Sequence, residues 1–160
     1  MTDVLSAKER SHCMSRIRGK DTKPERSIRK GLFALGFRYR LHQRSLPGCP
    51  DLVLNKYNAV IFVHGCFWHR HKCELFQWPK ANSGFWRRKI VRNRANDRKN
   101  LTKLNLAGWR TLIVWECAVR GKHRMDFPKV IDRIARWLCS QQRTLEISPS
   151  RRRTPRRSTS

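Results

Sequence analysis

A ten-residue stretch, His64-Gly-Cys-Phe-Trp-His-Arg-His-Lys-Cys73, concentrates the residue types that do chemistry. Five of its ten residues are histidines or cysteines, which bind metals, and histidine also transfers protons near neutral pH. An apolar run, Ala59-Val-Ile-Phe-Val63, precedes the stretch and is typical of a buried strand. The sequence therefore predicts a loop at a strand end that carries a metal site, an active site or both.

Thiol and imidazole groups in this loop predict a zinc site. Zn²⁺ takes four such ligands in tetrahedral geometry when its role is structural. The candidates are Cys66, His71, Cys73 and the distant Cys117. Their spacing is not that of a standard zinc finger, so buried free thiols are the alternative. That alternative is favoured for the remaining cysteines, which have no such ligands nearby: Cys13, Cys49 and Cys139.

A long helix between two apolar strands explains how Cys117 reaches the loop. A basic segment at about residues 84–107 follows a cap at Asn82 or Ser83 and ends before Gly108. The run 109–115 is the most apolar strand candidate. A β-α-β crossover makes parallel strands that end at the same edge of the sheet. Because Cys66 and Cys117 each follow one of these strands, we expect them to lie close together.

A carboxylate is expected beside the same strand end. Asp51 opens a short apolar strand, and a turn at 55–58 joins this strand to the next one. If the turn is centred near residues 56 and 57, Asp51 lies opposite Phe62 or Val63. The hairpin therefore brings a carboxylate to the loop that carries the histidines.

Oxygen ligands beside unligated imidazoles indicate a class of reaction. Asp51 and the Val63 carbonyl offer oxygens, which Mg²⁺ prefers. If zinc takes one histidine of the loop, His64 and His69 remain for proton transfer. A structural role is the alternative for either of these histidines alone. Together the groups indicate metal-assisted phosphodiester hydrolysis.

Three aromatic residues form another constellation. Phe67 and Trp68 lie in the polar loop, and Trp86 is followed by Arg87-Arg88-Lys89. For any one of them a place in the core is the alternative. Aromatics among cations are what base stacking, or wedging into a duplex, requires.

The outer segments predict further helices and a strand. Thr22-Lys-Pro-Glu25 is typical of a helix start, in which Glu25 could serve only as a capping residue. Gly36 would end this helix, and residues 37–41 alternate like a strand. A last helix opens at Asp126, with an apolar face of Val130, Ile131, Ile134, Trp137 and Leu138.

Charge limits the partners of the chain. Its formal net charge is +26, from 37 Lys and Arg against 11 Asp and Glu, which favours a polyanion such as nucleic acid. An anionic membrane surface would be the competing partner, but no apolar run reaches the roughly 20 residues that a membrane span needs. The N-terminus also has no signal-peptide pattern, so we expect a cytosolic protein. We also expect the chain to be a monomer. We expect a DNA-contacting arm at 1–20, a catalytic domain at 21–142 and a disordered basic tail at 143–160.

Several motifs resemble those of the very short patch repair endonucleases, the Vsr family. They are Ser45-Leu-Pro-Gly-x-Pro-Asp51, Val60-Ile-Phe-x-His-Gly-Cys-Phe-Trp-His69, Phe85-Trp86, and Leu112-Ile-Val-Trp-Glu-Cys-Ala118 with Arg120-Gly121. The resemblance covers about residues 10–138. It implies a restriction-endonuclease-like (PD-(D/E)XK-type) α/β fold, with a mixed central sheet flanked by helices and a structural zinc site. It also implies nicking of one DNA strand beside a T·G mismatch left by deamination of 5-methylcytosine, in the bacterial cytoplasm on nucleoid DNA, with repair proteins as further partners.

The resemblance also implies roles for individual residues. Asp51 and the Val63 carbonyl would bind Mg²⁺, Glu25 would hold metal-bound water, His69 would be the base, and His64 would assist at the phosphate or leaving group. Zn²⁺ would be held by Cys66, His71, Cys73 and Cys117. Phe67, Trp68 and Trp86 would intercalate beside the mismatch, with Met14 and Ile17 entering from the minor groove. Further DNA contacts would come from Lys89, Asn93 and Arg120.

Three features depart from the family pattern. Val63 stands where threonine is usual, Cys49 replaces a basic residue, and the Arg-rich tail has no counterpart. A zinc-stabilised DNA- or RNA-binding module without catalysis is the alternative function. The expected register of Asp51 with His64 and His69 favours the enzyme, because a binding module has no use for a carboxylate in a basic groove.

Overall fold

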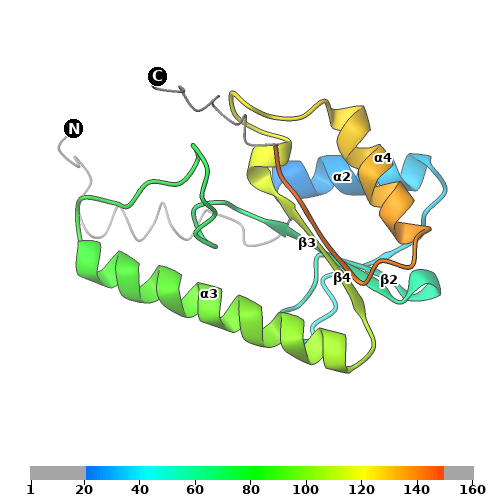
Figure 1. The fold of residues 1–160 in the computed structure, drawn as a ribbon, viewed down its shortest axis with the longest axis horizontal. Helices are drawn as coiled ribbons and strands as arrows, with labels where there is room; N and C mark the ends of the chain where they lie inside the picture. Colours follow the sequence, from blue (N-terminus) through cyan, green and yellow to red (C-terminus); the bar gives the residue numbers. More distant parts are fainter. Residues whose placement is uncertain (1–20, 150–160) are drawn as a thin grey trace, which may run out of the picture.

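The computed structural model describes residues 21–149, and its central element is a five-stranded mixed sheet in the order β1-β2-β3-β4-β5 (Figure 1). The strands are β1 (Arg40–Leu41), β2 (Leu52–Leu54), β3 (Ala59–His64), β4 (Arg110–Trp115) and β5 (Thr144–Ile147). The first three pair antiparallel, whereas β3, β4 and β5 pair parallel. The predicted mixed α/β class is confirmed.

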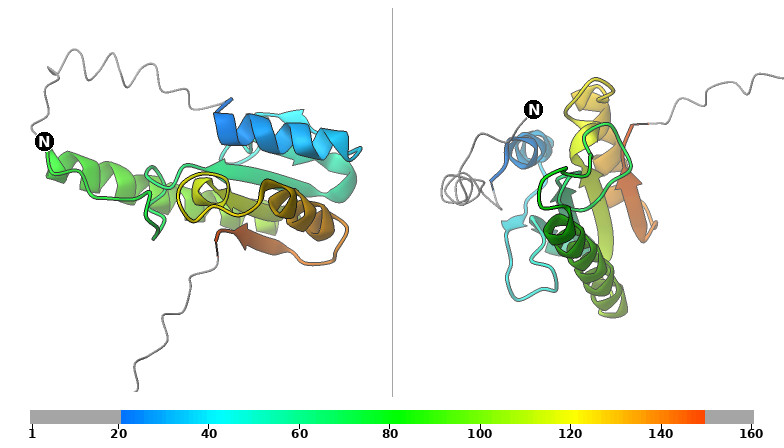
Figure 2. Two further views of the ribbon diagram at one scale, coloured as in Figure 1. Left: turned by 90° about the horizontal axis from the view of Figure 1, so that it is seen from above. Right: turned by 90° about the vertical axis from the view of Figure 1, so that its left-hand side faces the viewer.

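Helices cover both faces of this sheet (Figure 2). In the described part of the chain they are α2 (Lys23–Ala34), α3 (Ser83–Leu106) and α4 (Phe127–Leu138). Alternate residues of β3 point to opposite faces, as the pleat requires. Ala59 and Ile61 pack with α2 and α4, whereas Val60 and Phe62 pack with Leu104 of α3. The hydrophobic core is therefore two layers of side chains, one on each face of the sheet.

The first helix begins and ends where its sequence predicts. Thr22 Oγ1 accepts a hydrogen bond from the Glu25 N–H at 3.4 Å, which caps α2. At the other end, the Gly36 N–H donates to the Phe33 carbonyl and the Phe37 N–H to the Leu32 carbonyl, while Gly36 has a φ of +92°. This helix-ending motif uses the Phe37 amide, so the strand predicted for 37–41 is shortened to β1.

The hairpin register predicted for Asp51 is confirmed. Leu52 pairs with Ile61 and Leu54 with Ala59, so Asp51 falls opposite Phe62. The Val63 N–H donates to Asp51 Oδ2 at 2.7 Å. The parallel pairing of β3 with β4 is also confirmed, and it sets His64 level with Trp115. Both loops that follow these strands therefore leave from one edge of the sheet.

The last strand of the sheet, β5, differs from the prediction. Residues 144–147 lie in the segment expected to be a disordered tail, yet they form β5 and pair with β4. Ile147 is fully buried, and Glu146 Oε2 accepts a hydrogen bond from Trp115 Nε1 at 3.0 Å. A short alternating stretch thus completes the sheet, although its neighbours are rich in Arg, Ser and Pro.

Two further expectations concern the ends of the chain and the membrane. The N-terminal arm, with Met14 and Ile17, lies outside the described residues. Among the described residues, no helix is both long and apolar enough to cross a membrane.

Candidate active site and metal centre

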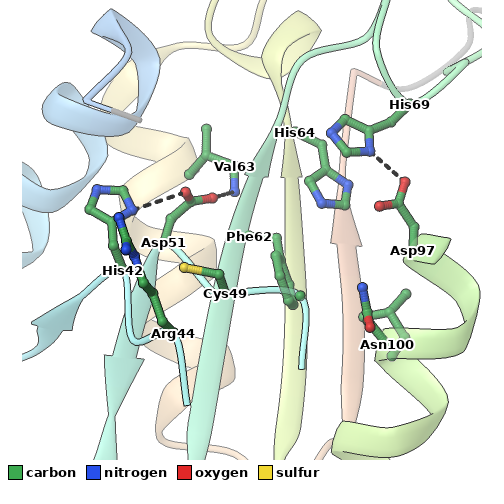
Figure 3. Close-up of a pocket in the computed structure, with 12 residues that line it drawn as sticks. His42, Arg44, Cys49, Asp51, Phe62, Val63, His64, His69, Asp97 and Asn100 are labelled. Carbon is green, nitrogen blue, oxygen red and sulfur yellow. Dashed lines mark hydrogen bonds and ion pairs between the residues drawn. The ribbon is translucent and has the colours of Figure 1, made fainter. Parts of the chain in front are cut away.

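A pocket of about 410 Å³ opens at the end of β3 and the start of β2 (Figure 3). Its walls come from the segment between β1 and β2, from β3, from the loop after β3 and from α3. The lining includes His42, Arg44, Cys49, Asp51, Phe62, Val63, His64, His69, Asp97 and Asn100. The fold therefore brings together Asp51, Val63, His64 and His69, all four named by the sequence.

Asp51 is the central carboxylate of this pocket. Its Oδ2 atom accepts the Val63 N–H, which leaves Oδ1 as the oxygen without a backbone donor in the described contacts. Burial raises the pKa of Asp51 to about 7, and the hydrogen bond from Val63 partly opposes this rise. A divalent cation near Oδ1 would favour the ionised form. The buried carboxylate therefore fits a hard cation with oxygen ligands.

Glu25 and His42 lie next to Asp51. Glu25 on α2 is 1% exposed, and its Oε1 atom lies 2.9 Å from His42 Nε2. The other ring nitrogen, Nδ1, lies 3.7 Å from Asp51 Oδ1. Burial raises the pKa of Glu25, while His42 and Arg29 lower it. Glu25 thus does more than cap its helix, because an imidazole links it to the central carboxylate.

Sequence reasoning missed His42. The residue follows β1, and its backbone N–H donates to the Asp51 carbonyl at 3.3 Å, which extends the pairing of β1 with β2. The alternation of residues 37–41 was the available signal. Its continuation by one residue, paired with the strand that Asp51 opens, places His42 beside that carboxylate.

His64 and His69 stack on each other. Their ring centroids are 3.8 Å apart and their planes differ by 5°. His64 is 7% exposed, and burial lowers its pKa well below the ordinary value, with a further contribution from His69. His64 is therefore neutral at neutral pH.

Asp97 is a second residue that sequence reasoning missed. Its Oδ2 atom makes a short contact with His69 Nδ1 (Figure 3). With the carboxylate ionised, Nδ1 carries the proton and Nε2 carries the lone pair. A signal was present, because Asp97 is the one acidic residue in the 24 residues of α3. A base held by a carboxylate is a common catalytic arrangement.

The four residues predicted for zinc form one cluster. One ligand atom from each of Cys66, His71, Cys73 and Cys117 lies within 4.8 Å of the others. The Cys117 N–H donates to Cys66 Sγ at 3.4 Å, so the two strand ends meet as predicted. A tetrahedral site with bonds of about 2.3 Å places its donors about 3.8 Å apart. His71 Nδ1 lies 3.6 Å from Cys66 Sγ and 3.4 Å from Cys117 Sγ, which is close to this separation.

The environment of these thiols also suits a cation. A hydrogen bond with Cys117 and burial raise the pKa of Cys66 above its ordinary range. A bound metal would reverse this shift, because it stabilises the thiolate. The His71 ring stacks on Trp115 at 4.3 Å, which fixes the orientation of the imidazole. Three thiols and an imidazole form a donor set that fits a closed, four-coordinate metal centre.

The three aromatic residues of the sequence prediction meet in one cluster. Phe67 lies 5.3 Å from Trp68 and 5.4 Å from Trp86, measured between ring centroids. All three are partly exposed. The N-terminal half of α3 extends beyond the sheet, and the loop that carries Phe67 and Trp68 runs beside it (Figure 1). The cluster therefore lies at a projecting part of the molecule rather than in the core.

Polar neighbours surround this cluster. Lys89 Nζ lies 5.8 Å from the Trp68 ring, and Asn93 Nδ2 donates to the Trp68 carbonyl at 3.2 Å. Arg120 is exposed and donates to Glu116 Oε1 at 2.7 Å. Eight exposed Lys and Arg side chains lie along α3, namely Arg87, Arg88, Lys89, Arg92, Arg94, Arg98, Lys99 and Lys103. This helix is a basic surface next to the pocket.

Comparison with known proteins gives a consistent family. The model of the family described as DNA mismatch endonuclease Vsr matches residues 2–75. The DNA mismatch endonuclease Vsr of Escherichia coli is 40% identical over 92% of this chain and 94% of its own length. The type II nicking enzyme V.NmeAIP of Neisseria meningitidis is 46% identical over 76% and 87% of the two chains. For V.XorIIP of Xanthomonas oryzae, also a type II nicking enzyme, the identity is 45% over 73% and 86%.

Proposed function

The chain belongs to the DNA mismatch endonuclease Vsr family and is a DNA endonuclease, and we propose that it nicks one strand beside a T·G mismatch to start very short patch repair. Hydrolysis would depend on Mg²⁺, and the substrate would be bacterial chromosomal DNA in the cytoplasm. The carrying observation is the arrangement of Asp51. Its carboxylate is largely buried, with a side chain that is 15% exposed, and one oxygen is held by the Val63 N–H. His69, with its partner Asp97, faces the same pocket.

The Mg²⁺ ion would be held by Asp51 and the Val63 carbonyl. When bound, Mg²⁺ stabilises the negative charge that develops on the phosphate. His69 would take a proton from the attacking water through Nε2, and Asp97 would stabilise the imidazolium that results. His64 is neutral and stacks on His69, so it would hold the base in place and face the phosphate or leaving group without adding charge.

Glu25 would hold water at the metal site. Its burial and its contact with His42 hold the carboxylate in one position. The restriction-endonuclease-like relationship belongs to the same proposal. The hairpin of β2 and β3 brings Asp51 beside the end of β3. By the resemblance, Asp51 would be the acid of such enzymes, and His64 would stand where they commonly have a lysine.

We propose Zn²⁺ for the thiol cluster, with a structural role. Three thiols and one imidazole leave no position for a substrate in a tetrahedral site. The metal would then tie the loop 65–73 to the residue after β4. Because that loop carries both His69 and Trp68, zinc would position catalytic and DNA-contacting residues without touching the substrate.

Mismatch recognition would use the aromatic cluster. Phe67, Trp68 and Trp86 would enter the stack beside the mismatch, and Met14 and Ile17 of the N-terminal arm would enter from the minor groove. Lys89 and Arg120 would make polar contacts with DNA. The Asn93 amide contacts the Trp68 carbonyl, so Asn93 would also support the loop that carries the wedge.

The decisive experiment is a nicking assay on two duplexes that differ only at the mismatched pair. A T·G duplex and the corresponding C·G duplex, each labelled on both strands, are incubated with the full chain and Mg²⁺. The proposal expects one nick, in the T-containing strand of the mismatch duplex only. Binding of both duplexes without any nick would favour the zinc-stabilised binding module. Equal nicking of both duplexes would contradict mismatch recognition.

A further inference from the structure

We propose that His42 is a metal ligand of the active site, with Glu25 as the carboxylate that fixes its ring. This inference rests on the proposed function only in taking Asp51 as the ligand of a divalent cation. His42 would supply a nitrogen to the same ion through Nδ1. The site would then combine an oxygen ligand from β2 with an imidazole from the end of β1.

The strand pairing places the His42 ring. The His42 N–H donates to the Asp51 carbonyl at 3.3 Å, so the two residues are neighbours across β1 and β2. Figure 3 shows the His42 ring turned toward the Asp51 carboxylate in the pocket wall. Nδ1 lies 3.7 Å from Oδ1, the oxygen that the Val63 amide leaves available.

The separation of these two atoms is close to that of neighbouring ligands of one ion. Two atoms at about 2.1 Å from an octahedral ion lie about 3.0 Å apart in neighbouring positions. The 3.7 Å between Nδ1 and Oδ1 is about 0.7 Å longer, so binding of an ion would draw the two atoms together. It is too long for a hydrogen bond, so the atoms face each other without a direct bond.

A carboxylate lies beside the second ring nitrogen of His42. Histidine ligands usually donate their other N–H to a carboxylate, which orients the ring and selects the tautomer. His42 Nε2 lies 2.9 Å from Glu25 Oε1, although its N–H does not point straight at that oxygen. With the proton on Nε2, the lone pair is on Nδ1 and faces Asp51.

The Glu25 carboxylate is itself held from the other side. Arg29 Nη1 lies 3.5 Å from Glu25 Oε1 and donates to Asp21 Oδ1 at 2.7 Å. Glu25 is 1% exposed and comes from a capped helix. A buried carboxylate supported in this way serves a precise orientation of the imidazole. It explains why a glutamate is buried at a point where a helix cap alone would not require it.

A nitrogen ligand alters the choice of metal. Imidazole increases the affinity for transition ions over Mg²⁺, whereas carboxylate and carbonyl oxygens suit both Mg²⁺ and Mn²⁺. We therefore expect the chain to bind Mn²⁺ more tightly than Mg²⁺, with His42 responsible for most of the difference.

Pulsed electron paramagnetic resonance of the Mn²⁺-loaded full chain tests this directly. Protein labelled with ¹⁵N-histidine should show the coupling of a coordinated imidazole nitrogen. The variant His42→Gln should lose this coupling. The control variant His69→Ala, which removes another histidine of the pocket, should keep it. Retention of the coupling in His42→Gln, or its absence from wild-type protein that binds Mn²⁺, would overturn the proposal.

Two further variants separate failure of the His42 proposal from failure of the proposed function. Glu25→Gln should keep the nitrogen coupling while weakening Mn²⁺ binding by roughly 10- to 100-fold, as expected for an outer carboxylate. Asp51→Asn should abolish Mn²⁺ binding in this pocket. Undiminished binding by Asp51→Asn would overturn the proposed function itself, whereas loss of binding there together with unchanged coupling in His42→Gln would overturn only the role of His42.

Discussion

The thiol cluster and the carboxylate pocket occupy the same edge of the sheet but differ in almost every physical respect. The thiol cluster draws three ligands from one loop and a fourth, Cys117, from the end of β4. The pocket draws its groups from four separate elements. Trp115 lies between them, with its ring stacked on His71 and edge-on to His64 at 5.4 Å. One aromatic side chain thus lies against a histidine of each centre.

The difference in donors predicts a difference in roles. Thiols and imidazole in a closed set of four fit a metal that stays with the fold. A buried carboxylate in an open pocket fits an ion that meets a substrate. Removing a ligand should therefore damage the whole molecule in the first case and only the chemistry in the second.

Cys117→Ser should produce the largest loss. A structural zinc site contributes binding energy directly to folding, so the variant should lose zinc and several kcal/mol of stability. DNA binding and nicking should fall together with the folded fraction. Metal analysis and urea unfolding of the purified variant provide the measurement. One tightly held zinc in the variant would show that Cys117 is not a ligand and would contradict a structural site of these four residues.

Asp51→Asn should abolish nicking and leave the fold intact. The amide keeps an acceptor for the Val63 N–H but loses the charge that would hold the proposed divalent ion. Loss of several kcal/mol of transition-state stabilisation corresponds to at least about a thousandfold in rate. Single-turnover nicking of a T·G duplex measures the effect, and binding of the same duplex serves as the control. Normal turnover would contradict the assignment of Asp51.

The same variant should be more stable than the wild type in Mg²⁺-free buffer, but only at higher pH. The pKa of Asp51 is raised from 3.8 to about 7 in the folded state. The folded form therefore favours the neutral carboxyl, and its stability falls as pH rises from about 4 through 7. Asp51→Asn removes this loss, so its advantage should be near zero at pH 3.5 and reach up to about 4 kcal/mol at pH 8, from 1.36 kcal/mol for each pKa unit. Urea unfolding of both proteins across this range is the test. An advantage independent of pH would mean that packing, not ionisation, causes it.

Two features of the site could be predicted because the order and length of the helices and strands determine them. The length of the hairpin turn sets Asp51 beside Val63, and the β-α-β rule brings Cys117 to Cys66. Each rule needs only the order and length of elements. The thiol cluster was therefore predicted completely, since all its members follow from one loop and one crossover.

The residues that were missed depend on packing that spacing does not determine. His42 reaches Asp51 only because β1 pairs with β2, and the C-terminal motif of α2 shortens β1 to two residues. Asp97 reaches His69 because of the direction in which α3 crosses the sheet. β5 was missed because four residues with one buried side chain, Ile147, carry a weaker pattern than the basic tail around them.

Trp68→Ala tests the loop that connects the two centres. A T·G pair is weaker than a matched pair, so inserting a wedge there costs less, and unstacking costs a few kcal/mol per step. Stacking on an aromatic returns roughly 1–3 kcal/mol per base, so the variant should nick T·G duplexes about ten- to a hundredfold more slowly. Binding to matched duplex should barely change, because phosphate contacts carry it. Normal nicking, or equal loss of both properties with loss of folding, would assign Trp68 to the core.

Truncation after Pro149 should have the smallest effect, because it removes neither centre. Residues 151–160 contain five arginines, and their loss should weaken binding to matched and mismatched DNA equally. The dependence of log affinity on log salt should become shallower by at most about 4.5, which is about 0.9 for each arginine. Truncation after Gln142 is the matched comparison, since it also removes β5 and the Glu146 contact that fixes Trp115. That longer truncation should lower stability and nicking, because Trp115 supports both His71 and His64.

Duplex binding at three salt concentrations, with thermal unfolding of both variants, separates the two effects. A mismatch-selective loss on removing only 150–160 would contradict a tail that contacts phosphates alone.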